Sequence, residues 1–202
     1  MKHSQYGQDT FIEGLFPDKS DGVFIDIGAH DGVEYNNSKL FEDKGWTGIC
    51  IEPLPNVFKE LNKNRNCIKE NCAISNEEGE FDFVQIHGYG EMLSGFGREE
   101  IAQYTINSHG GSYDVIKVPV FKLETILNKH NIKDIDFCSI DVEGNELNVV
   151  KSVNFDNINI QYLCIEASPG IEQVQQYISQ WYDHIATIGG DRIYKSKSNG
   201  RN

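Results

Sequence analysis

Positive charge is scarce in this chain of 202 residues. Its 18 Lys and Arg residues are outnumbered by 31 Asp and Glu residues, which gives a formal net charge of -13 at pH 7. Nucleic acids and anionic membrane surfaces repel such a chain. We therefore expect no nucleic-acid partner.

Long apolar runs are also missing. No segment approaches the roughly 20 consecutive apolar residues that span a bilayer. The opening MKHSQYGQD lacks the apolar middle region of a signal peptide. The sequence thus predicts no membrane insertion and a cytoplasmic protein.

Cysteines are few, and none of them form a C-x-x-C pair. An odd number of scattered cysteines favours reduced, buried thiols over a disulfide or zinc framework. The five are Cys50, Cys67, Cys72, Cys138 and Cys164.

The usual phosphate-binding motifs are absent as well. A dinucleotide site needs G-x-G-x-x-G, whereas the chain has Gly28-x-x-x-Gly32, and no glycine precedes Lys and Ser/Thr in a P-loop frame. Both a nicotinamide site and a P-loop are therefore disfavoured.

What is present is an alternation of apolar strands with amphipathic stretches. It predicts an α/β fold with a Rossmann-like, doubly wound, mostly parallel sheet, in a single domain over residues 1–202. Two β-rich runs around Gly189-Gly190-Asp191 predict a C-terminal antiparallel hairpin. A glycine-rich stretch over about 87–112 predicts a lid or, equally, a long surface loop. The last residues, about 195–202, are predicted to form a frayed tail.

Two acidic residues follow consecutive strands. Asp26 lies just before the Gly28 turn in FIDIGAHDG, where a phosphate would be repelled, and Glu52 ends the next strand in GICIEP. S-adenosylmethionine has no phosphate and carries a sulfonium and an ammonium. Its ribose hydroxyls could donate hydrogen bonds to Glu52. We predict that this cofactor binds here. The structural alternative is a turn-capping Asp26 and a solvated Glu52.

Four segments carry a family resemblance: HSQYGQD, FIDIGAHDG, NNSKLFEDKGWTGICIEPLPNVFKELNKNR and FCSIDVEGNELNVV. They resemble the FkbM-type methyltransferases from about Ser4 to Glu166, a family of S-adenosylmethionine-dependent enzymes of the class I, Rossmann-like type that O-methylate sugars or natural products. His30 stands where the family more often has Asn, and the sequence Asn36-Asn37-Ser38 varies on a Ser/Asn-rich theme.

The resemblance also implies a set of cofactor-binding residues. Glu52 would hold the ribose, the turn after the first strand would hold the methionine part, and residues after the next two strands would pack near the adenine. Helix capping explains Asn37 and Ser38 nearly as well, and core packing is an even alternative for Cys72 and Ala73. The predicted set is Gln8, Asp26, Gly28, Ala29, His30, Asn37, Ser38, Glu52, Pro53, Cys72 and Ala73, with Leu54 beside the adenine.

Further acids end the later strands. Asp141 and Glu166 follow the strands FCSI and YLCI, with Glu143 close by. In an open α/β sheet these strand ends face the cleft, so the acids could act as a base, orient hydroxyls or hold a divalent cation such as magnesium on Asp141 and Glu166. His109, on a glycine-flanked loop, is a secondary base candidate.

The function predicted from these residues is O-methylation of a small-molecule or glycan hydroxyl, with a sugar of a glycan or of an activated sugar precursor as the acceptor. The alternative is an inactive S-adenosylmethionine-binding module that acts through interaction.

Overall fold

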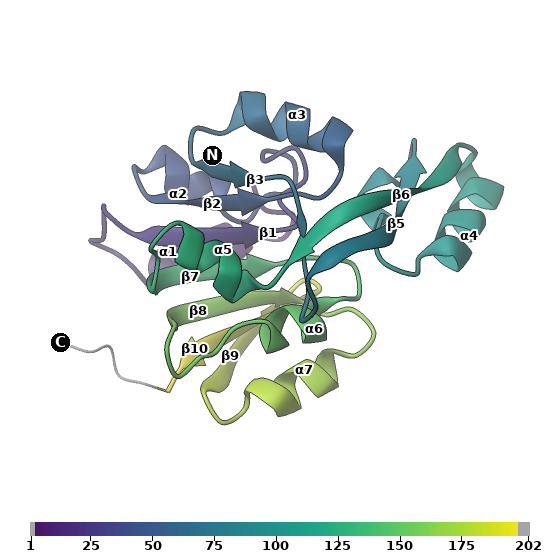
Figure 1. The fold of residues 1–202 in the computed structure, drawn as a ribbon. Helices are drawn as coiled ribbons and strands as arrows, with labels where there is room; N and C mark the ends of the chain where they lie inside the picture. The colour runs from purple at the N-terminus through teal and green to yellow at the C-terminus, as the bar shows by residue number, and fades with distance from the viewer. Residues whose placement is uncertain (1–2, 198–202) are drawn as a thin grey trace.

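The computed structural model describes residues 3–197, and its centre is a seven-stranded sheet. Every strand runs parallel except the one next to the C-terminal edge, which is antiparallel to both neighbours, so the predicted sheet and hairpin are confirmed. The strand order is β3 (Ile68–Glu70), β2 (Thr47–Ile51), β1 (Val23–Ile27), β7 (Asp134–Ile140), β8 (Asn159–Glu166), β10 (Asp191–Ser196) and β9 (Tyr182–Ile188) (Figure 1).

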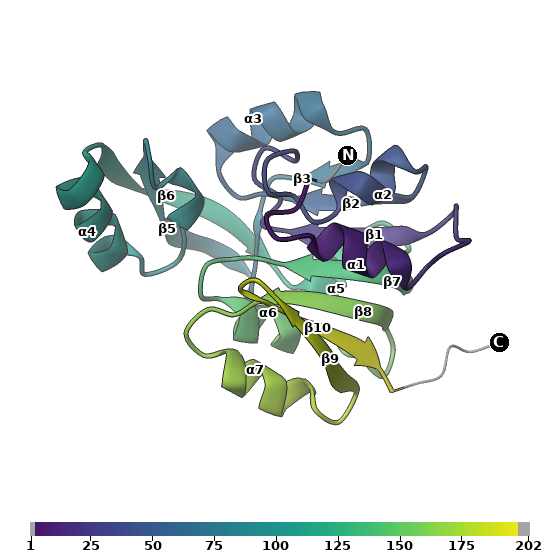
Figure 2. The ribbon, with the colours of Figure 1, turned by 180° about the vertical axis from the view of Figure 1, so that it is seen from behind.

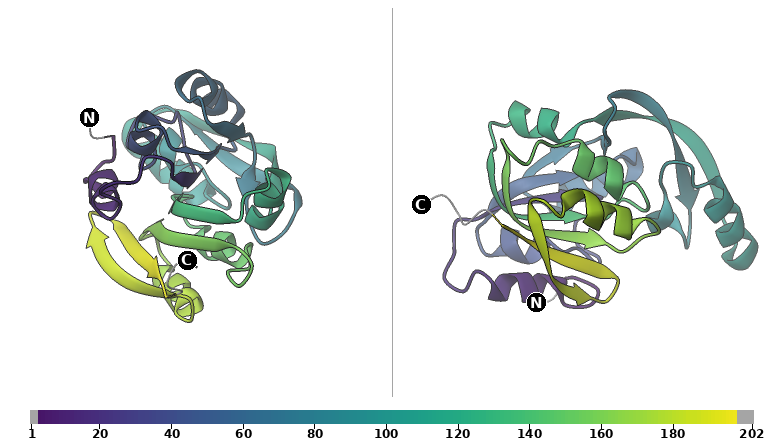
Figure 3. Two further views of the ribbon diagram at one scale, coloured as in Figure 1. Left: turned by 90° about the vertical axis from the view of Figure 1, so that its left-hand side faces the viewer. Right: turned by 90° about the horizontal axis from the view of Figure 1, so that it is seen from below.

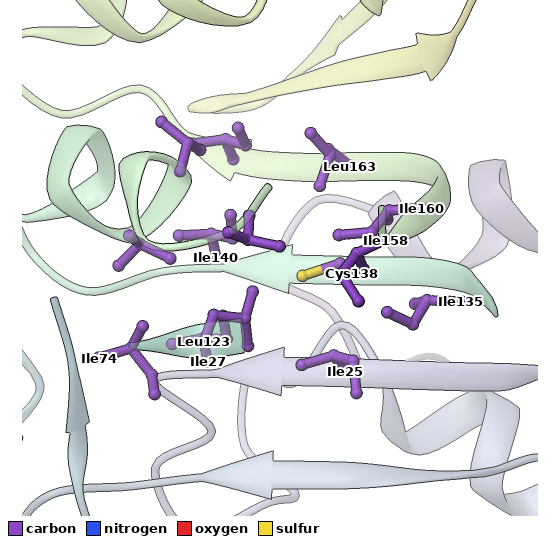
Figure 4. Packing of buried hydrophobic residues seen from close by; sticks show 14 of the residues in the cluster. Ile25, Ile27, Ile74, Leu123, Ile135, Cys138, Ile140, Ile158, Ile160 and Leu163 are labelled. Atoms are coloured by element: carbon purple, nitrogen blue, oxygen red, sulfur yellow. The ribbon is translucent and has the colours of Figure 1, made fainter. Parts of the chain in front are cut away.

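One face of this sheet packs on three helices. Ile25 and Ile27 of β1 point to that face, because alternate residues of a strand share a side. Figure 4 shows them beside Cys138 and Ile140 of β7 and Leu163 of β8. Each fully buried side chain of this kind contributes roughly 1.5–3 kcal/mol. The covering helices are α5 (Leu123–Lys129), α6 (Glu146–Lys151) and α7 (Ile171–Ile178).

The opposite face packs on the three N-terminal helices. Phe24 and Cys50, one residue out of phase with the isoleucines, belong to that second core together with Phe41 and Leu61. Figure 2 looks onto this side, with the first helix in front of the sheet. The helices are α1 (Gln8–Gly14), α2 (Lys39–Asp43) and α3 (Pro55–Asn64).

A second sheet of three strands forms an arm, which the sequence did not predict as a separate unit. In it β5 (Gly79–His87) pairs antiparallel with β6 (Ser112–Phe121), and β4 (Ala73–Ile74) adds to β6. Figure 3, right, shows the arm curving away from the body with α4 (Glu99–His109) at its end. The glycine-rich stretch predicted over 87–112 contains α4 and the short helix η1 (Glu91–Leu93), and its role as a lid stays a prediction.

The strand register aligns one edge of the main sheet. Ile27 lies opposite both Ile51 and Ile140, and Ile140 lies opposite Ile165. The residues that follow these positions, Gly28, Glu52, Asp141 and Glu166, therefore lie side by side at this edge. The strand order reverses between β1 and β7, which is where α/β sheets bind ligands.

Within residues 3–197, no helix has both the length and the apolar character needed to cross a bilayer. Residues 198–202 of the predicted frayed tail lie outside the described residues.

Candidate active site

A cavity of about 350 Å³ opens at this edge of the sheet. Two sets among its lining residues carry the polar groups at the strand ends. One set comes from the turn after β1 and the end of β2, and the other comes from the ends of β7 and β8. We call them the turn set and the acidic set. The turn set is Gly28, Ala29, His30, Glu52 and Leu54, and the acidic set is Asp141, Glu143 and Glu166.

The turn after β1 depends on a glycine. The N–H groups of Gly28 and Ala29 both donate to the carbonyl of Ile51 at 3.0 Å, which bends the chain sharply. Gly28 has a φ of 83°. A Cβ added to Gly28 would lie 1.7 Å from the carbonyl oxygen of Asp141, so no other residue fits without backbone movement.

Glu52 is buried at the end of β2 and joins the turn to the next segment. Its Oε2 accepts the N–H of His30 at 3.0 Å, and its Oε1 accepts the N–H of Leu54 at 2.8 Å. Burial raises the pKa of Glu52 to about 7 despite these bonds. Each carboxylate oxygen keeps a further lone pair, so Glu52 can also accept two hydroxyl groups of a ligand.

Asp26 anchors the loop that follows the turn. Its Oδ2 accepts hydrogen bonds from Asn36 Nδ2 at 2.8 Å and Ser38 Oγ at 2.5 Å. Burial raises the pKa of Asp26, and the Arg65 guanidinium 3.9 Å away opposes that rise. Asp26 reaches the cavity wall, but one of its oxygens is committed to the loop.

Arg65 is a buried cation that sequence reasoning missed. The residue is 1% exposed and lies beneath the loop. Its Nη1 donates to the carbonyl of Gly32 at 3.2 Å, its Nη2 to Ser38 Oγ at 3.0 Å, and its Nε to Glu42. The only hint in the sequence is an arginine just after a helix, which is usually solvated, so no local pattern could have identified this role.

The acidic set is a close cluster of carboxylates. One oxygen from each of Asp141, Glu143 and Glu166 lies within 4.8 Å of the other two. Burial, followed by repulsion from Glu166 and Glu143, raises the pKa of Asp141 well above its usual value. Burial and repulsion between the acids also raise the pKa of Glu166 to about 7. Such a group takes up and releases protons near neutral pH.

Arg98, at the start of α4, balances part of this charge. Its Nη2 donates to Glu143 Oε2 at 2.7 Å. The pKa of Glu143 is raised by burial, and Arg98 limits the rise. Sequence reasoning missed Arg98, because the arm that carries it is distant in sequence from β7.

The arm also supplies one wall of the cavity. Residues of η1 and the following Ser94 and Phe96 line it. Glu91 accepts a hydrogen bond from Asn56 Nδ2 at 3.1 Å and lies 3.6 Å from the His30 ring. His30 has a φ of 48° and Glu143 a φ of 57°, both in the left-handed region. Strained backbone of this kind concentrates at functional sites.

Most predicted site residues line this cavity. Asn37 is 7% exposed, its Nδ2 donates to Ser139 Oγ, and its Oδ1 has no hydrogen-bond partner among residues 3–197. The predicted residues that line the cavity are Asp26, Gly28, Ala29, His30, Asn37, Glu52, Pro53, Cys72, Ala73, Asp141, Glu143 and Glu166.

Three predicted residues lie outside the cavity lining. Ser38, at the end of the loop, is fully buried between Asp26 and Arg65. Gln8 donates to Asp191 Oδ2 at 2.8 Å and so fixes the start of β10. His109 lies on the arm, where its ring stacks on Tyr89 at 4.2 Å. The binding and catalytic roles of these three stay predictions, because the geometry gives each of them a structural contact instead.

The sheet order and the polar strand ends around one cavity define a Rossmann-like fold of the methyltransferase type. The model of the methyltransferase FkbM domain matches residues 26–193. The chain therefore belongs to the FkbM methyltransferase family, and the resemblance noted in the sequence is confirmed.

Comparison with a solved structure supports the fold. A crystal structure of methyltransferase FkbM from Methylobacillus flagellatus KT is 15% identical with a TM-score of 0.56, over 93% of this chain and 47% of that chain. The chain thus spans about half the length of that relative. A METTL16 methyltransferase domain is 15% identical with a TM-score of 0.47, over 95% of this chain and 66% of that one. No curated protein matches the sequence.

Proposed function

We propose that the chain transfers a methyl group from S-adenosylmethionine to a hydroxyl of a sugar, in a glycan or an activated sugar precursor. The family supports methyl transfer. The observation that carries the proposal is that Glu52 and Asp141, at the ends of β2 and β7, open into the same cavity on either side of the Gly28 turn.

The residues present fit this cofactor. Glu52 would accept hydrogen bonds from the ribose hydroxyls. The Oδ1 of buried Asn37, which has no hydrogen-bond partner within the described residues, would accept one from the ammonium N–H. The buried apolar surface of Leu54, Cys72 and Ala73 would cover the adenine with Pro53. When bound, the cofactor supplies a methyl group on a sulfonium. The volume of about 350 Å³ lies within the range of small-molecule sites.

The acidic set would serve the acceptor. Methyl transfer is an in-line displacement, so positioning supplies much of the rate. The hydroxyl must still lose its proton, and a carboxylate group whose pKa lies near neutrality can take it up. Glu166, with a pKa raised to about 7 by burial, and Asp141 beside it are the residues for that step.

A divalent cation is a second way to use the same acids. The oxygens of Asp141, Glu143 and Glu166 lie close enough together to bind one divalent cation. Magnesium is such a cation, and it prefers oxygen ligands. Such an ion would acidify the acceptor hydroxyl directly.

The proposal also covers the partners and the location. A net charge of -13 supports an acceptor other than nucleic acid. The five free cysteines support a reducing, cytoplasmic location.

Two experiments test the proposal. In the first, thermal unfolding is followed with S-adenosylhomocysteine and with NAD, and only the former should raise the midpoint. In the second, labelled S-adenosylmethionine is supplied with nucleotide sugars and glycan fragments. The proposal that the chain is an enzyme is supported if the parent protein turns over and Asp141→Asn is roughly 10²–10⁴-fold slower. Binding without turnover on any acceptor supports the inactive module instead.

A further inference from the structure

Two of the five cysteines lie side by side at the edge of the main sheet. A hydrogen bond links Cys67 Sγ and Cys50 Sγ at 3.5 Å. Cys50 is buried in β2, whereas Cys67 is partly exposed in the bend just before β3. In the register of β2 and β3, Cys50 lies opposite Lys69, so residues 67 and 69 share the face on which Cys50 lies.

The environment activates one sulfur of this pair. The hydrogen bond with Cys50 and the nearby Arg65 guanidinium lower the pKa of Cys67. Burial instead raises the pKa of the partner Cys50 and of Cys138 and Cys164, and it raises the pKa of Cys72 to about 12. A partly exposed thiolate beside a second thiol is an arrangement that peroxides oxidise readily.

We propose that Cys67 and Cys50 are a redox-sensitive pair that hydroperoxides convert to a disulfide. The Cys67 thiolate attacks one peroxide oxygen, an S–O bond forms as the O–O bond breaks, and the leaving oxygen takes up a proton and departs as water or an alcohol, which leaves Cys67 as a sulfenic acid. The sulfur of the Cys50 thiol then attacks the Cys67 sulfur, a bond forms between the two sulfurs, and the sulfenic hydroxyl takes up the Cys50 thiol proton and leaves as water. The two thiols are oxidised by two electrons and one peroxide is reduced.

The pair is connected to the cavity through Arg65. The N–H of Cys67 donates to Glu42 Oε1 at 2.7 Å, and Glu42 also pairs with Arg65. Arg65 in turn holds Gly32 and Ser38 in the loop after β1. Pulling Cys67 toward Cys50 therefore loosens the loop of residues 28–38. This step does not depend on the proposed function, because it concerns the loop and not its ligand.

Mass spectrometry of the whole chain tests the pair. The reduced protein is treated with a small excess of hydrogen peroxide and digested without reduction. We expect a loss of two hydrogens, a cross-linked peptide joining residues 50 and 67, and reversal by dithiothreitol. The other three cysteines are internal controls that should still react with an alkylating agent after denaturation. Cys67→Ser should show no disulfide. An unchanged mass, or a disulfide between other cysteines, overturns the proposal.

Amide hydrogen exchange tests the connection to the loop. Exchange in residues 28–38 should rise on oxidation of the parent protein and stay constant in Cys67→Ser under the same treatment. A disulfide that leaves exchange in this loop unchanged contradicts the role of Arg65. Neither readout needs S-adenosylmethionine, so a failure of the proposed function and a failure of this inference are distinguishable.

Discussion

Gly28 lies directly against the main chain of Asp141. The carbonyl of Ile27 accepts the N–H of Asp141 at 3.0 Å, and a Cβ on Gly28 would be 1.7 Å from the Asp141 carbonyl oxygen. The turn set and the acidic set are therefore joined by backbone contacts at the point where the strand order reverses. We therefore expect a change on one side of this contact to displace the other.

Gly28→Ala tests that contact. The φ of 83° and the overlap with Asp141 should together reduce the free energy of unfolding by roughly 2–5 kcal/mol. Urea unfolding measures the change. Gly14→Ala is the matched control, because an added Cβ at Gly14 would meet nothing within 4 Å in the part of the chain that the structure describes. Equal stability of the two variants would show that the turn tolerates a side chain.

Arg65→Met tests the buried network beneath the loop. The substitution fills a similar volume but leaves the carboxylates of Asp26 and Glu42 buried without their cation. We expect a loss of about 3–5 kcal/mol in the free energy of unfolding. Arg192→Gln, which removes a surface partner of Glu172, should change it by about 1 kcal/mol or less. A small effect at Arg65 would mean that the carboxylates are neutral or hydrated.

The strand ends of the site could be predicted from the sequence, and their partners could not. Gly28, Glu52, Asp141 and Glu166 follow apolar strands, and parallel pairing brings such positions to one edge. Predicting that these residues lie at one edge of the sheet requires no knowledge of side-chain contacts.

Arg65 and Arg98 escaped prediction because their partners are chosen by tertiary structure. Each arginine lies in a polar stretch, and nothing local distinguishes a buried cation from a solvated one. The separation of β5 and β6 into an arm was missed for a related reason. Alternating apolar residues indicate a strand but do not say which sheet it joins. His109 fitted a catalytic loop by composition, whereas it lies in the last turn of α4.

Glu52→Gln tests the raised pKa of Glu52. A carboxyl whose pKa rises from its ordinary 4.5 to about 7 on folding favours the folded state fully below 4.5, and that contribution is lost as pH rises through 7. The parent protein should therefore lose stability relative to Glu52→Gln between pH 5 and 8, by at most about 1.4 kcal/mol per pH unit. Urea unfolding at several pH values measures the difference. A difference independent of pH would show that Glu52 titrates normally.

Arg98→Gln tests the balance of charge in the acidic set. Loss of the guanidinium should raise the pKa of Glu143 and Glu166 further, because Arg98 lowers both. Carboxyl carbon NMR as a function of pH follows each group. Lys117→Gln removes an exposed cation of the arm that pairs with Asp82, and it should leave both titrations unchanged. Identical titrations in parent and Arg98→Gln would place Arg98 away from these acids in solution.

Calorimetric titration with S-adenosylhomocysteine tests the central claim, that this cavity holds the cofactor through Glu52. The parent protein should bind one equivalent. Glu52→Ala should bind roughly 10- to 100-fold more weakly, as expected when hydrogen bonds to a charged group worth about 1.5–3 kcal/mol are lost. Glu60→Ala, on the exposed side of α3, should bind like the parent. No binding by the parent protein, or parent-like affinity in a folded Glu52→Ala, would contradict the account.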